Sequence, residues 1–203
     1  MKHYILLLAA LLTAAALQAQ TPADSTLTQA QHQKFKGVEI TGTKDAFFRQ
    51  LYKNGYSEMQ PASDQTMYAG IFAGYKVETT VMETPITKTV YSVVAALPRR
   101  VHFEESYEDF KTLLGHLTAV YGQPADRHEE FKSPYTRGDG YSIKALKEGK
   151  ANFQATWNTG PGIILIKIIN TPDSASRLLL AYTDIANEET NENEKTEIIR
   201  RDL

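Results

Sequence analysis

The chain has 203 residues, with 22 Lys and Arg against 24 Asp and Glu, and no cysteine. This balance of charge leaves no basic surface for phosphate groups, so we expect no nucleic-acid partner. Without cysteine the protein forms no disulfide or thiolate metal site, and it carries no lipid-modified N-terminal cysteine, so it is not a lipoprotein. Hydrophobic residues make up 42% of the chain, which suffices for a packed core.

The first 19 residues have the three parts of a secretory signal peptide. Residues 1–3 form a short basic segment, residues 4–17 carry no charge, and Leu17-Gln18-Ala19 offers a cleavage site before Gln20. The uncharged run is shorter than the roughly 20 residues of a membrane-spanning helix. We therefore expect residues 1–19 to be removed on export to the periplasm or the cell exterior, with no stable membrane span afterwards.

The remaining chain divides by composition into three parts. Residues 20–34 are polar and lack an apolar period, which predicts a flexible leader. Residues 35–186 predict a single domain, in which 35–98 and 105–186 share an order of helix and strands and form two possible degenerate repeats. Residues 187–203 are polar and acidic, which predicts a disordered tail or a short exposed helix.

Two helices stand out in this domain. Residues 43–54 predict the first, with Thr43 as cap, Asp45 in the first turn and Gly55 at its end. Residues 106–121 predict the second, with Ser106 as cap. Its apolar residues follow helical spacing and are Phe110, Leu113, Leu114, Leu117, Val120 and Tyr121.

Alternation of polar and apolar residues predicts antiparallel strands with one wet face. These strands cover residues 35–40, 68–72, 75–82, 89–97, 127–132, 152–158, 163–169 and 177–185. Residues 163–169 are almost continuously apolar, which predicts a central strand covered at least in part on both faces. The expected fold class is therefore α+β, an antiparallel sheet with two main helices packed on one face.

Metal and catalytic motifs are weak. The best metal candidates are His128 and Glu130 on one strand face with Asp126 beside them, but this spacing is common by chance and favours a solvated strand edge. We expect no metal and no cofactor. No Gly-x-Ser-x-Gly turn occurs. Paired acids for hydrolysis remain open, and the candidates are Glu104, Glu105, Asp139 and Asp184. By default we expect each of these four to be an ordinary surface acid.

Aromatic residues offer one candidate binding surface. A sheet face that carries Tyr68, Tyr75 and Tyr91 can bind a protein or a sugar, because tyrosine combines contact area with a hydrogen-bonding hydroxyl. The alternative is that these tyrosines fill the edge of the core beneath the helices.

Several segments carry a resemblance to a known family. They are residues 35–43, 51–56, 70–75, 90–93, 117–124 and 181–187, which include Leu51-Tyr52-Lys53-Asn54-Gly55-Tyr56 and Val120-Tyr121-Gly122-Gln123-Pro124. Their order and spacing resemble a family of exported proteins of unassigned function from Gram-negative gut bacteria. The arrangement is also similar, at the level of fold, to tandem helix-plus-sheet modules such as the β-lactamase inhibitory protein.

Two hypotheses about function follow. The first is a non-enzymatic, exported binding module for an envelope protein or glycan, and the second is an exported hydrolase that uses paired carboxylates. A cavity that gathers two carboxylates favours the hydrolase, whereas a broad, shallow sheet face favours the binding module.

Overall fold

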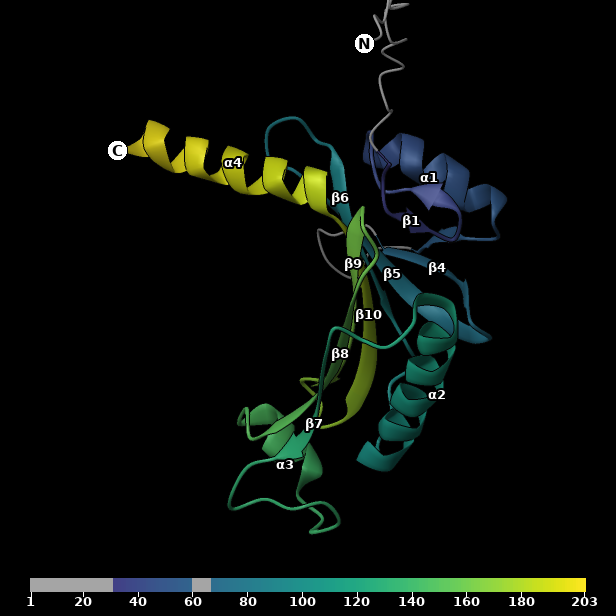
Figure 1. The fold of residues 1–203 in the computed structure, drawn as a ribbon, viewed down its shortest axis with the longest axis vertical. Helices are drawn as coiled ribbons and strands as arrows, with labels where there is room; N and C mark the ends of the chain where they lie inside the picture. Colours follow the sequence, from purple (N-terminus) through teal and green to yellow (C-terminus); the bar gives the residue numbers. More distant parts are fainter. Residues whose placement is uncertain (1–30, 60–66) are drawn as a thin grey trace, which may run out of the picture. The chain divides into compact units, whose positions relative to one another are not determined.

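The computed structural model describes residues 31–59 and 67–203 (Figure 1). The predicted signal peptide and residues 20–30 of the predicted leader lie outside the described residues. In chain order the elements are β1 (Lys34–Phe35), β2 (Val38–Glu39), α1 (Lys44–Lys53), β3 (Ser57–Met59), β4 (Met67–Phe72), β5 (Tyr75–Glu83), β6 (Val90–Ala96), α2 (Phe103–Tyr121), β7 (Asp126–Phe131), α3 (Ser142–Lys147), β8 (Ala151–Asn158), β9 (Gly162–Asn170), β10 (Ser176–Asp184) and α4 (Ile185–Asp202).

Eight of the strands form one antiparallel sheet in the order β3-β4-β5-β6-β10-β9-β8-β7. Strands β3 to β6 form one meander and β7 to β10 another, and the two meet where β6 pairs with β10. Each meander is preceded by a helix, α1 or α2. The predicted fold class, α+β with an antiparallel sheet, is confirmed.

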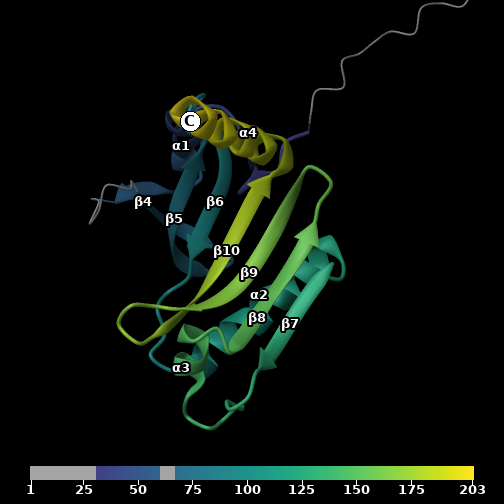
Figure 2. The same cartoon turned by 90° about the vertical axis from the view of Figure 1, so that its left-hand side faces the viewer.

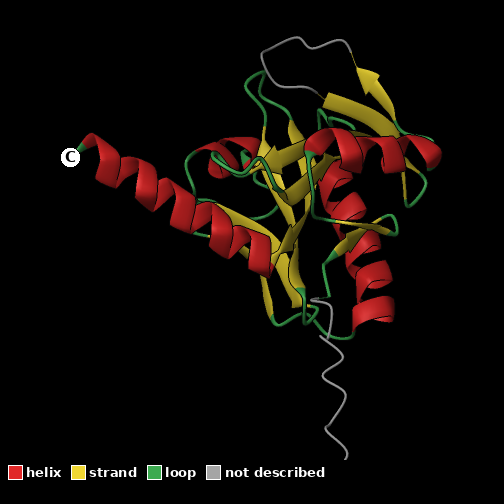
Figure 3. Ribbon diagram, turned by 90° about the horizontal axis from the view of Figure 1, so that it is seen from above, coloured by secondary structure: helices red, strands yellow, loops and turns green. Residues whose placement is uncertain are grey.

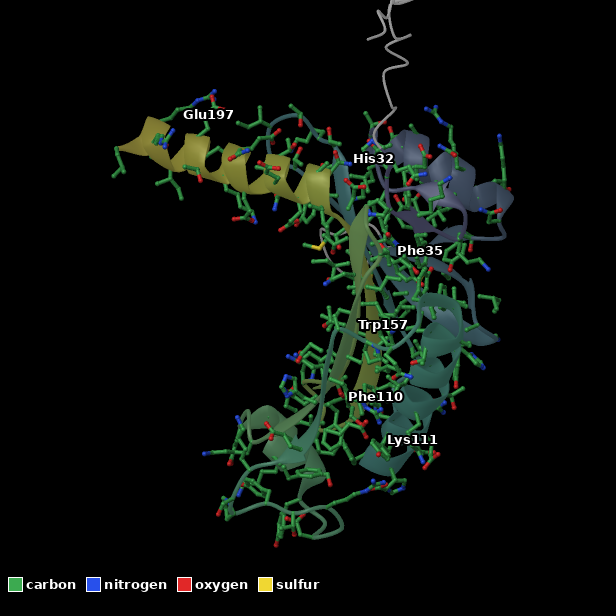
Figure 4. All side chains as sticks on the ribbon, viewed as in Figure 1. His32, Phe35, Phe110, Lys111, Trp157 and Glu197 are labelled. Carbon is green, nitrogen blue, oxygen red and sulfur yellow. The ribbon has the colours of Figure 1, made fainter. Side chains whose placement is uncertain are left out.

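The core lies between one face of this sheet and the helices α1 and α2, which share that side in Figure 3. Helix α2 packs on β9 and β10, and α1 contacts β5. The labelled side chains of Phe110 and Trp157 lie between the strands and α2 in Figure 4. Every second residue of β9 and β10 points to this side, namely Ile164, Ile166, Ile168, Leu178 and Leu180.

The start of α2 differs from the prediction. The helix begins at Phe103, and its N-cap His102 makes no side-chain cap hydrogen bond. Ser106, the predicted cap, lies inside the helix, where its hydroxyl is buried 2.9 Å from that of Ser176 on β10. The helix therefore uses this serine to bind the sheet and not to close its own first turn.

The predicted flexible leader is wrong for the part of it that the structure describes. Gln33 is buried, its N–H donates to Asp184 Oδ2 at 2.8 Å, and its carbonyl accepts from Ile40 at 2.8 Å. Its side chain also packs on Gly162, where a Cβ would lie 2.6 Å from Gln33 Cβ and 2.4 Å from the Thr183 carbonyl. His32 and Gln33 both bind the Asp184 carboxylate at the end of β10, so polar composition does not reveal that this segment packs on the sheet.

The predicted C-terminal tail is one long helix, α4 (Figure 2). Asp184 caps it by accepting from Asn187 N at 3.0 Å, and the Asn187 amide donates to the carbonyls of Ile40 and Val90. Further along, Asn191 and Glu194 are also buried. Since polar side chains make these contacts, the helix shows no apolar stripe in the sequence. No helix within residues 31–59 and 67–203 is long and apolar enough to cross a membrane.

Candidate functional site

The sheet face opposite α1 and α2, which we call the open face, carries a strip of aliphatic side chains. The strip consists of Val94 and Ala96 on β6, Leu179 and Ala181 on β10, and Ile163, Leu165 and Ile169 on β9. Strand register places these residues side by side, since Leu179 pairs with Ala96 and Ala181 pairs with both Val94 and Leu165. All of them retain some solvent exposure, and Ile163 is 37% exposed.

Alternation along the strands explains why the strip exists. The helix-facing residues of β9 are buried, and the residues between them turn to the open face. In an antiparallel sheet with one solvated face those positions are ordinarily polar. Here they are Ile163, Leu165 and Ile169, interrupted only by Lys167. In Figure 1, α4 extends from this side at the end of β10, and its contacts fall on β6 and the end of β10.

Charged and polar residues border the strip. Arg177 on β10 is held in place, because its Nη2 lies 2.8 Å from Glu78 Oε2 and its Nε donates to the Leu97 carbonyl at 3.0 Å. Lys167 has no ion-pair partner among residues 31–59 and 67–203. The outer strands supply Asn152 and Gln154 on β8 and Asp126 and Glu130 on β7. An apolar centre with a polar border is typical of a protein–protein interface.

Two open hollows flank the strip on the β5 side. One of about 450 Å³ is lined by residues that include Thr80, Met82, Tyr91 and Val94. The other, of about 420 Å³, includes Lys76, Glu78, Ala96, Arg99 and Arg177. The open face therefore combines an apolar centre with small hollows at its β5 side.

The three predicted tyrosines do not share one exposed face. Tyr68 is buried and stacks on Phe48 with ring centroids 4.1 Å apart, and burial raises its pKa. Tyr75 is half-buried against the core, where burial and then Asp109 of α2 raise its pKa. Only Tyr91 lies at the open face, next to Met82 and close to α4, where it is 8% exposed. A β-bulge between Met82 and Glu83 interrupts the regular alternation beside it.

The predicted metal candidates do share one face of β7. Asp126 Oδ1 lies 3.1 Å from His128 Nε2, and Glu130 pairs with Lys132 at 3.8 Å. The His128 and Asp126 side chains are 42% and 52% exposed. Within the described ranges no three acidic or histidine side chains form a group that could hold a metal ion. The arrangement is that of a solvated strand edge.

The candidate paired acids bind other groups. Glu104 pairs with Arg137 at 2.6 Å, Glu105 is exposed, and Asp139 accepts from the N–H groups of Thr136 and Tyr141, which lower its pKa. The expectation that Asp184 is a surface acid is wrong, since it is fully buried.

Sequence reasoning missed the cluster around Asp184. Its Oδ2 lies 3.0 Å from His32 Nδ1 and accepts from Gln33, while its Oδ1 caps α4. His32 is labelled in Figure 4 near the start of α4. Because these partners are distant along the chain, no local motif predicts the cluster. Its contacts join the N-terminal segment to β10 and α4.

Comparisons of the chain with models of protein families, with curated proteins and with solved structures find no match.

Proposed function

We propose that the protein is an exported, non-enzymatic interaction module that binds a protein partner of the cell envelope across its open face. The observation that carries this proposal is the aliphatic strip on β6, β10 and β9, whose side chains remain partly exposed on the face away from α1 and α2. Exposed apolar surface that is contiguous and bordered by polar residues marks an interaction site.

A partner bound on the open face accounts for the apolar run of residues 163–169. Its sequence predicts cover at least in part on both faces. Helices α2 and α3 contact β9, yet Ile163, Leu165 and Ile169 on the open face keep part of their surface in solvent. A partner on the open face supplies the second cover, and burial stabilises the complex by about 25 cal/mol per Å² of apolar surface. The hollows beside Tyr91 and Arg177 then receive side chains of the partner.

Export rests on the signal-peptide pattern of residues 1–19 and places the partner in the envelope. The alternative, a hydrolase with paired carboxylates, gains no support from the geometry. The hollow beside Glu104 and the hollow beside Asp139 each contain only that one of the four candidate acids.

Site-specific photo-crosslinking in the native cell tests the proposal. A photo-reactive amino acid in place of Leu165 on the open face should give one discrete crosslinked product in the envelope fraction. The same amino acid in place of Lys111, an exposed residue on α2, should give none. A second substitution, Leu179→Asp, should abolish the product while leaving the circular dichroism spectrum unchanged. Equal products from both positions, or none from Leu165, would contradict the proposal.

A further inference from the structure

A separate groove lies between α3 and the turn that joins β9 to β10. It has a volume of about 640 Å³, which is in the range of small-molecule sites. Its lining includes Tyr141, Ile143, Lys144, Lys147, Asn170 and Ser174. None of these residues belongs to the aliphatic strip of the open face.

A second hollow of about 350 Å³ adjoins the groove at Tyr141. The two hollows share Tyr141 and Lys144, and the second adds Tyr135, Thr136 and Asp139. Tyr141 lines both hollows and is 58% exposed, so much of its surface is open to solvent. Two adjoining hollows that share an exposed aromatic residue suit a chain-like ligand with more than one ring.

The charges in the groove are unevenly distributed. Glu148 accepts from the Tyr135 hydroxyl at 2.7 Å, and its Oε1 lies 3.9 Å from Lys144 Nζ. Glu148 and Lys144 therefore form an ion pair with each other. Lys147 has no ion-pair partner in the part of the chain that the structure describes. Asp139, in the second hollow, stays ionised because two backbone N–H groups lower its pKa. An anionic group is therefore drawn to the Lys147 end and repelled from the Asp139 end.

The remaining lining suits hydroxyl groups. The Asn170 amide and the Ser174 hydroxyl make no hydrogen bond to protein within the described ranges. The turn that carries Ser174 is well held, since Thr171 N donates to the Ala175 carbonyl at 2.8 Å. Ser174 itself has a φ of 61°, an uncommon conformation for a non-glycine residue that often occurs at functional sites.

We propose that this groove binds an acidic oligosaccharide. The carboxylate of one sugar pairs with Lys147, a sugar ring stacks on Tyr141, and Asn170 and Ser174 take hydroxyl groups. A tyrosine face provides apolar contact for the C–H groups of a sugar, and the free ammonium group supplies a charge-assisted hydrogen bond. This site is distinct from the open face, so the proposal holds or fails independently of the proposed function.

Calorimetric titration of the full mature chain tests it with three probes, which are tetragalacturonate, the neutral maltotetraose and sodium acetate. We expect saturable binding of tetragalacturonate, weakened about tenfold or more by Lys147→Gln and by Tyr141→Ala. Lys53→Gln, which removes an exposed charge at the end of α1, is the control and should not change the affinity.

Four results would overturn the proposal. The first three are no saturable binding of tetragalacturonate, equal affinity for maltotetraose, and equal weakening by Lys53→Gln. The fourth is that acetate binds as tightly as tetragalacturonate, because the groove would then be a simple carboxylate site. Circular dichroism of each variant verifies that it is folded, and Lys147→Gln lies at an exposed position where folding is not at risk.

Discussion

Leu117 and Val120 lie one helical turn apart on α2, yet their surroundings differ. Leu117 is 5% exposed in the core, as its spacing predicts, whereas Val120 is 71% exposed. We expect Leu117→Ala to lower the free energy of unfolding by about 2–5 kcal/mol, because it leaves a cavity. Val120→Ala should change it by less than about 0.5 kcal/mol. Urea denaturation followed by circular dichroism measures both, and similar losses for the two variants would show that the helix face is assigned wrongly.

The sequence does not predict the hydrogen-bond partners of the polar residues Ser106 and Asp184. Each has a sequence context that fits an ordinary local role, a helix cap for Ser106 and a surface acid for Asp184. Each instead binds a group that is distant along the chain, Ser176 in one case and His32 and Gln33 in the other. A buried polar side chain is satisfied by whichever partner the fold brings to it, and spacing along the sequence does not record that partner.

One carboxylate of α4 binds the loop between β5 and β6. Glu194 accepts from Ile86 N at 2.6 Å and from the Thr87 hydroxyl at 2.5 Å, which fastens the helix to the loop between β5 and β6. Burial by itself would raise the pKa of Glu194, but these hydrogen bonds outweigh it and the net pKa is lowered. Since the folded state favours the charged form, the contact contributes most above the ordinary pKa of 4.5 and is lost as the pH falls below it.

Glu194→Gln should therefore lower the melting temperature at neutral pH, and the difference from the wild-type protein should shrink as the pH falls from about 5 to 3. Glu197→Gln is the matched control, because Glu197 is exposed on the same helix and contacts only Arg201 among the described residues (Figure 4). Differential scanning fluorimetry across this pH range provides the measurement. A difference for Glu194→Gln that stays constant from pH 7 to pH 3 would exclude the proposed role of its charge.

The elements also differ in how well periodicity predicted them. Strands β5, β8 and β10 alternate as predicted, because each has one buried face. Strand β9, whose sequence predicts cover at least in part on both sides, alternates between buried and partly exposed residues. Helix α4 has almost no apolar period and was predicted as a disordered tail or a short helix, since its contacts with the sheet are made by Asn187, Asn191 and Glu194.

At the scale of the whole molecule, export remains a prediction from residues 1–19. Mature protein recovered from cells should begin near Gln20, as determined by mass spectrometry of its N-terminal peptide. Cleavage there keeps His32 and Gln33, whose contacts with Asp184 hold the start of the described chain against β10. Recovery of the envelope protein with Met1 intact would contradict the prediction.

Hydrophobic periodicity predicts the fold class, most strand positions and both core helices, because it is a local property of a few turns or residues. The pairing of β6 with β10 becomes visible only in the folded sheet, and it assembles the aliphatic strip from three strands. Folding also brings His32 to Asp184 across 152 positions and places α3 beside the turn that carries Ser174. These associations arise from the order of strands in the sheet, which depends on long-range packing and leaves no local pattern in the chain.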